Sequence, residues 1–112
     1  MKHDGMMELL KHALYTMNDD LKDAEYYLDS AMAAKDAGMN ECSSMYLKKA
    51  ARRAGEDYKA SHDILTNTMQ KMATMGVETR PDSVEGYLWQ ASLSRYDHWA
   101  EDMKQKVKEM GL

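Results

Sequence analysis

The chain has 112 residues, of which 44% are hydrophobic and 30% charged, with a single Pro. This length is typical of one domain that buries a core without disulfides, and the composition argues against disorder and for long uninterrupted helices. The net charge of −4 is small and the Lys and Arg residues are spread among Asp and Glu, so we expect neither nucleic-acid nor membrane binding.

The methionine and cysteine content indicates what kind of core the protein has and in which compartment it is found. The chain contains 12 Met and no Phe, and a core rich in Met adapts easily to repacking or to a partner. The lone Cys42 cannot form an internal disulfide, and the sequence shows no stretch of signal-peptide or membrane-spanning type. We therefore expect a cytoplasmic protein.

Apolar residues recur with alternating steps of four and three along residues 5–37, which predicts the first helix. Asp4 is placed to cap its start, and Gly38 can supply the left-handed residue after its end. The predicted core seam of this helix consists of Leu10, Leu14, Met17, Leu21, Ala24, Leu28 and Ala31.

The same steps predict a second, uninterrupted helix over residues 40–75, with Asn40 as its cap and Gly76 after its end. The connection to the first helix is only about three residues long, which forces the two helices to lie antiparallel. The predicted seam consists of Leu47, Ala51, Ala54, Tyr58, Ser61, Leu65, Thr68, Met72 and Met75.

Residues 77–81 form the one predicted loop, and Asp82 with Glu85 resembles a capping box that opens a third helix over residues 82–110. The seam of this helix consists of Trp89, Leu93, Tyr96, Ala100, Met103, Val107 and Met110, and Gly111 follows it. The expected fold class is all-α: a single domain, residues 1–112, in which three long helices form an antiparallel up-down-up bundle.

The third helix carries more apolar residues than one seam requires. Val84, Tyr87, Leu88 and Trp99 lie away from its seam, so a three-helix core would leave part of this surface in water. The loop and the Met-rich helix ends could fold over it. We favour a second copy of the chain, and we expect a homodimer whose contact residues are Val84, Leu88, Trp89 and Trp99.

Polar residues beside the seams should meet at mid-height. In an antiparallel hairpin, residues equally far from the turn are level, which places Asp20 beside Asp57 and His62 opposite Asp97, with Tyr58 one turn away. Two adjacent carboxylates would share a proton, recruit Lys or Arg, or bind a cation. Alternatively, each reaches water or a base such as Lys48 or Lys59. For His62 we expect a hydrogen bond to Asp97 in preference to a metal.

The sequences KDAEYY at residues 22–27 and RAGEDYKASHDIL at residues 53–65 resemble the first hairpin of short bacterial ferritin-like proteins. The resemblance covers about residues 10–70 and implies a ferritin-like bundle in which Glu25 matches the first-helix metal ligand. Ferritin-like di-iron sites also require two Glu-x-x-His pairs on a four-helix bundle. This chain has no Glu-x-x-His and three predicted helices, so the resemblance favours the fold over the iron chemistry.

Three functions follow as hypotheses. The first is a non-catalytic, self-associating helical-bundle protein of ferritin-like type, without cofactor and without catalytic residues. The alternative is a divergent ferritin-like metal-binding protein that holds iron, manganese or zinc through the candidate ligands Asp20, Glu25, Asp57, His62 and Asp97. A third reading is an adaptor whose Met-rich ends hold a helix of another, unidentified protein partner.

Overall fold

The computed structural model describes the backbone of residues 2–76 and 84–111 and the side chains of residues 5–76 and 92–111. Every element in these ranges is helical, which confirms the all-α prediction. The elements are α1 (Lys2–Asp36), α2 (Asn40–Arg52), the π-helix η1 (Arg53–Asp57), α3 (Tyr58–Thr74) and α4 (Val84–Glu109). The second predicted helix is thus three consecutive segments, because a π-helical turn interrupts it.

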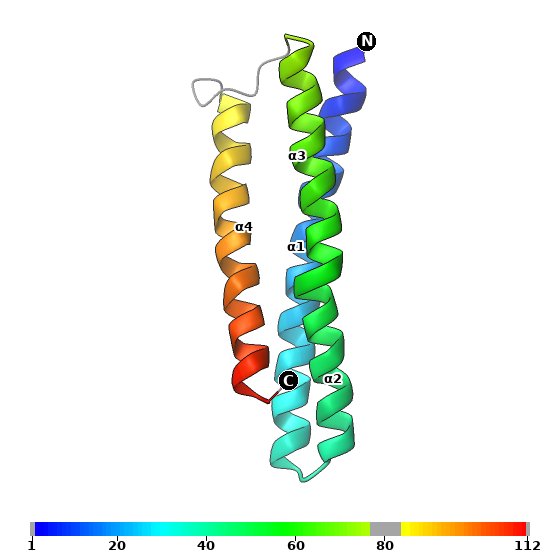
Figure 1. Ribbon diagram of the computed structural model, residues 1–112, viewed down its shortest axis with the longest axis vertical. Coiled ribbons are helices and arrows are strands. Elements are labelled where there is room, and N and C mark those ends of the chain that lie inside the picture. The colour runs from blue at the N-terminus through cyan, green and yellow to red at the C-terminus, as the bar shows by residue number, and fades with distance from the viewer. Residues whose placement is uncertain (1, 77–83, 112) are drawn as a thin grey trace.

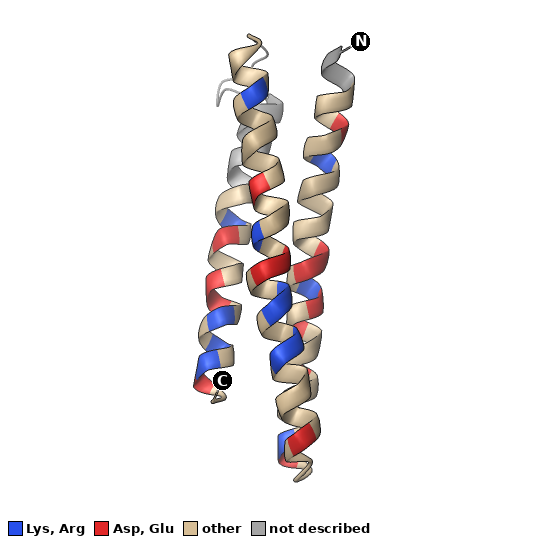
Figure 2. Ribbon diagram, turned by 45° about the vertical axis from the view of Figure 1, so that its right-hand side comes forward, with Lys and Arg blue, Asp and Glu red and all other residues tan. Residues whose placement is uncertain are grey.

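The helices lie side by side along one long axis (Figure 1). α2, η1 and α3 run antiparallel to α1, and α4 runs parallel to α1. The molecule measures 56 × 22 × 16 Å along its principal axes. The turn between α1 and α2 extends beyond the end of α4 in both views of the ribbon (Figures 1 and 2), so that end of the molecule is a two-helix hairpin.

Glycine ends the helices as the sequence predicts. Gly38, Gly76 and Gly111 have φ values of 76°, 78° and 102°, which only glycine adopts without steric cost. After α1 the amide of Met39 donates to the carbonyl of Ala34 at 2.8 Å and that of Gly38 donates to the carbonyl of Lys35 at 3.0 Å. This is the Schellman pattern, which satisfies the free carbonyls at a helix end.

The predicted helix starts are less accurate. α1 begins at Lys2, so Asp4 lies inside the helix and cannot be its cap. Met39 takes the N-cap position of α2 without a side-chain hydrogen bond, and Asn40 is the first helical residue. The predicted loop at residues 77–81 and the capping box of Asp82 and Glu85 lie outside the described residues and side chains.

The core follows the predicted seams closely. All seven seam residues of α1 are buried, and the largest fully buried side chains are Leu10, Met17, Leu21, Leu65, Met72 and Met103. Burying a side chain of this size contributes about 1.5–3 kcal/mol. Among the described seam positions, Met75 is 48% exposed, Ala50 is fully buried in place of the partly buried Ala51, and Leu93 and Met110 are partly buried.

The π-helical turn explains the exchange of Ala51 for Ala50. On α2, η1 and α3 the buried positions include Leu47, Ala50, Ala54, Tyr58 and Ser61, so two steps of four follow one another around Ala54. A π-helical turn accommodates one extra residue. The alternating spacing of four and three residues between buried positions is therefore shifted by one residue on the N-terminal side of η1. A prediction that assumes one regular helix places Ala51 in the core, where the structure has Ala50.

No described helix is both long and apolar enough to cross a membrane. Figure 2 shows residues of both charge signs along the helices. This distribution agrees with the interspersed charges of the sequence.

Candidate functional site

The first polar group at mid-height joins α1 to the π-helical turn, and we call it the Asp20–Arg53 cluster, after Asp20, Asp23, Arg53 and Asp57. Arg53 lies 3.6 Å from the carboxylate of Asp20, 3.7 Å from that of Asp23 and 3.2 Å from that of Asp57, to which it also donates a hydrogen bond. The register prediction that places Asp20 beside Asp57 is confirmed. One guanidinium group thus lies within ion-pair distance of three carboxylates.

Asp20 is the most buried member of this cluster. Its side chain is only 7% exposed, and its Oδ2 atom is buried without a hydrogen-bond partner among the described residues. Burial, followed by the negative charge of Asp57, raises the pKa of the Asp20 carboxyl to about 6, although the positive charge of Arg53 opposes the shift. Asp20 therefore changes its charge in the mildly acidic range.

The second polar group joins α3 to α4, and we call it the Tyr58–Asp97 cluster, after Tyr58, His62 and Asp97. The hydroxyl of Tyr58 donates a short hydrogen bond to Oδ1 of Asp97, and Nε2 of His62 lies 3.4 Å from the same oxygen. The predicted position of His62 opposite Asp97 is confirmed, whereas the predicted hydrogen bond between them is not among the hydrogen bonds of the described residues. Burial and the hydrogen bond to Asp97 both raise the pKa of the Tyr58 hydroxyl, so Tyr58 acts as a neutral donor.

The two clusters lie on different flanks of the helix, so the single polar layer expected from the sequence is divided. Asp57 contacts α1 through Arg53, whereas Tyr58, the next residue, contacts α4. Successive residues of a helix point about 100° apart. Within the described part of the chain, no three His, Cys, Asp or Glu side chains are grouped closely enough to hold a metal ion.

Glu25, the residue that the ferritin resemblance singles out, belongs to neither cluster. Its carboxylate accepts a hydrogen bond of 2.9 Å from the indole nitrogen of Trp99. Trp99 packs partly buried against the core, which differs from the expectation that its ring faces away from the three helices. This contact holds α4 against α1.

Glu25 lies where two adjoining hollows between α1 and α4 meet, and together we call them the α1–α4 groove. One hollow, of about 550 Å³, is lined by Leu28, Met32, Met103 and Met110 and by the charged residues Glu25, Asp29, Lys106 and Glu109. The other, of about 700 Å³, contains Trp99 and Arg95. Met32 is 53% exposed, so the groove presents apolar side chains to solvent. Of the predicted contact residues, the side chains of Val84, Leu88 and Trp89 lie outside the described ones.

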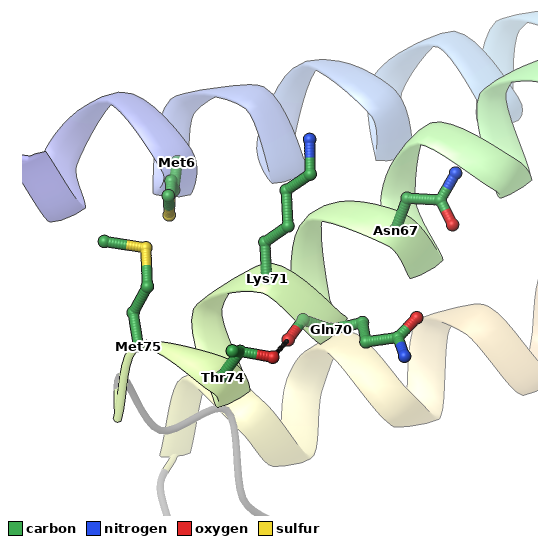
Figure 3. A pocket seen from close by; sticks show the side chains of 6 residues that line it. All are labelled: Met6, Asn67, Gln70, Lys71, Thr74 and Met75. Carbon is green, nitrogen blue, oxygen red and sulfur yellow. Dashed lines mark hydrogen bonds between the residues drawn. The ribbon is translucent and has the colours of Figure 1, made fainter.

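A third hollow lies between the start of α1 and the end of α3. Figure 3 shows Met6 and Met75 reaching toward each other across it, with Lys71 beside them. Its volume is about 440 Å³. The hydroxyl of Thr74 donates to the backbone carbonyl of Gln70 at 3.0 Å, so this polar group is already satisfied within α3. Met72, also part of the predicted Met-rich end, is fully buried and therefore acts as a core residue.

Of the other candidate groups, His98 lines the larger hollow of the α1–α4 groove. Cys42 is a free, partly exposed thiol, and Ser94 and His98 are exposed on α4.

Arg53 is not among the bases predicted from the sequence. The predicted bases Lys48 and Lys59 are both exposed, and Arg53 is the base that contacts Asp20 and Asp57. A local signal was present, because Arg53 and Asp57 are four residues apart, the spacing at which opposite charges pair on a helix.

No known protein family matches the chain, and no significant match was found among curated proteins or solved structures.

Proposed function

We propose that this chain is a non-catalytic, self-associating helical-bundle protein of ferritin-like type, and that it forms a homodimer through the α1–α4 groove. The observation that carries the proposal is the apolar part of this groove, where Met32 is 53% exposed and Met110 is partly exposed, while Leu28 and Met103 in the same lining are buried. A helix of a second copy laid along it would occupy the place of a fourth helix. Aromatic and methionine side chains are enriched in such contacts.

The groove carries charges of both signs, which a contact between two copies of the chain can pair. The acids Glu25 and Asp29 come from α1 and the acids Asp102 and Glu109 from α4, and the bases Arg95 and Lys106 also come from α4. In a two-fold contact each surface meets itself, so acids of one copy can face bases of the other. A surface of one sign would repel its own copy.

The same proposal includes the predicted contact residues earlier on α4. Leu88 precedes Trp99 by eleven positions in the sequence, which is about three turns of an α-helix. Val84 and Trp89 flank Leu88 in the sequence. The contact surface would thus extend along most of α4, as a stable dimer requires.

Light scattering after gel filtration tests the proposal. The wild-type chain should elute with twice the mass of one chain at micromolar concentration. Met32→Glu should shift it to a monomer, because a charge would have to be buried in the contact. Ile64→Glu is the matched control, since Ile64 on α3 is 47% exposed, close to the 53% of Met32, and should leave the mass unchanged. A wild-type monomer would contradict the proposal.

Metal binding takes second place, because Arg53 lies between the carboxylates of Asp20 and Asp57 and supplies the positive charge that a cation would bring. Elemental analysis of protein purified without chelator distinguishes the two functions. Iron, manganese or zinc near one equivalent, lost in Asp57→Ala, would favour the metal-binding alternative.

A further inference from the structure

Asp20 combines features that a purely structural ion pair does not need. It is buried in the middle of the bundle, one of its oxygens has no hydrogen-bond partner among the described residues, and its contact with Arg53, at 3.6 Å, is longer than a hydrogen bond. A buried carboxylate with an unpaired oxygen is costly as an anion. Adding a proton removes the charge and gives that carboxyl group a hydrogen to donate.

The groups that face Asp20 carry more negative than positive charge. From α1 it meets Asp19 and Asp23, and from η1 it meets Asp57 and Arg53. On the last turn of α2, Arg52 lies 4.0 Å from Asp57 but is 73% exposed, so water screens it. The helices α2, η1 and α3 follow one another as one continuous rod, the α2–η1–α3 rod. α4 contacts a different flank of this rod from the one that α1 contacts, and there Asp97 contacts Tyr58 and His62.

From this geometry we propose that Asp20 is a proton-binding site that couples mildly acidic pH to the packing of α1 against the π-helical turn. A proton from solvent binds the Asp20 carboxylate, and no other bond changes. One negative charge disappears from the Asp20–Arg53 cluster, and Arg53 is left to neutralise Asp23 and Asp57. The contact between α1 and η1 therefore tightens in acid and loosens when Asp20 ionises.

The direction of the effect follows from proton linkage. The pKa of Asp20 is about 6 in the folded chain against an ordinary value of 3.8, so the folded chain binds this proton more tightly than the unfolded chain. Stability is then greatest below about pH 4 as far as this group is concerned, and it falls as pH rises from about 4 to about 6. Most carboxylates in ion pairs have the opposite effect.

The experiment combines two readouts on the full chain. The ¹³C shift of the Asp20 carboxyl, followed by NMR from pH 3.5 to 8, should show a midpoint near 6. Amide hydrogen exchange of residues 53–57, corrected for the intrinsic rate, should be up to about tenfold slower at pH 5 than at pH 7.5, since one pH unit below the folded-state pKa corresponds to a factor of ten. Asp20→Asn should lose this difference, whereas Asp63→Asn, an exposed carboxylate on α3, should keep it.

Two outcomes would overturn the proposal: an Asp20 midpoint below about pH 4.5, the range of an ordinary carboxyl, or an Asp20→Asn protein that keeps the pH-dependent protection. If Asp20→Asn does not fold, Asp57→Asn replaces it. Removing the like charge of Asp57 should lower the Asp20 midpoint, and an unchanged midpoint would reject the coupling. A chain that stays monomeric would show the same results, so this test is independent of the proposed self-association.

Discussion

The two flanks of the α2–η1–α3 rod hold carboxylates next to neighbouring helices in different ways. On the α1 flank, three carboxylates surround Arg53, and the buried member keeps an unpaired oxygen. On the α4 flank, the single carboxylate of Asp97 receives a hydroxyl and lies beside an imidazole. The first arrangement depends on one cation and on pH. The second depends on the hydrogen bond that the neutral hydroxyl of Tyr58 donates to Asp97.

Arg53→Ala should have the largest effect, because it leaves three carboxylates without their shared cation. We expect a loss of about 2–3 kcal/mol in the free energy of unfolding at pH 7, somewhat less than for a fully buried pair, because Arg53 is 39% exposed. Urea denaturation measures it. Arg52→Ala, at the neighbouring and more exposed position, should cost less than about 0.5 kcal/mol. Equal losses in the two variants would remove the distinction between the flanks.

Tyr58→Phe should have a smaller effect on the α4 flank. It removes one hydrogen bond to a carboxylate, for which we expect about 1–1.5 kcal/mol, since Asp97 is 49% exposed and can turn to water. Thermal unfolding of this variant is best compared with Tyr15→Phe, whose ring is 69% exposed and which should behave as the wild type. A loss greater than that of Arg53→Ala would reverse the order of the two flanks.

Gly55→Ala should have the smallest effect, and it tests whether the π-helical turn η1 requires glycine. A Cβ atom at Gly55 would meet nothing within 4 Å, and its φ is not in the left-handed region. Alanine should therefore stabilise the chain by about 0.5–1 kcal/mol through the lower entropy of its unfolded state. Destabilisation would mean that the π-helical turn itself requires glycine. The midpoint of urea denaturation distinguishes the two results.

The comparison also shows which parts of the candidate site were predictable. The pairing of Asp20 with Asp57 and of His62 with Asp97 followed from distance along an antiparallel hairpin, because equal distance from a turn means equal height. The position of Asp57 and His62 on two flanks of the second predicted helix also followed, whereas the hydrogen bond of Tyr58 to Asp97 did not, since it depends on the azimuth of α4. Glu25 illustrates the limit: its match to a metal ligand rests on sequence position, while its carboxylate accepts a hydrogen bond from Trp99. Dimerisation and a cytoplasmic location stay predictions.

The sequence by itself determined the helices, their glycine ends and almost all of their buried seams, because these depend on spacings of three and four residues and on the local conformational freedom of glycine. Only the tertiary structure decided that Arg53 to Asp57 form a π-helical turn, that Ala50 is buried in place of Ala51, and that Arg53 is the base shared with Asp20. Each of these depends on how one helix sits against another.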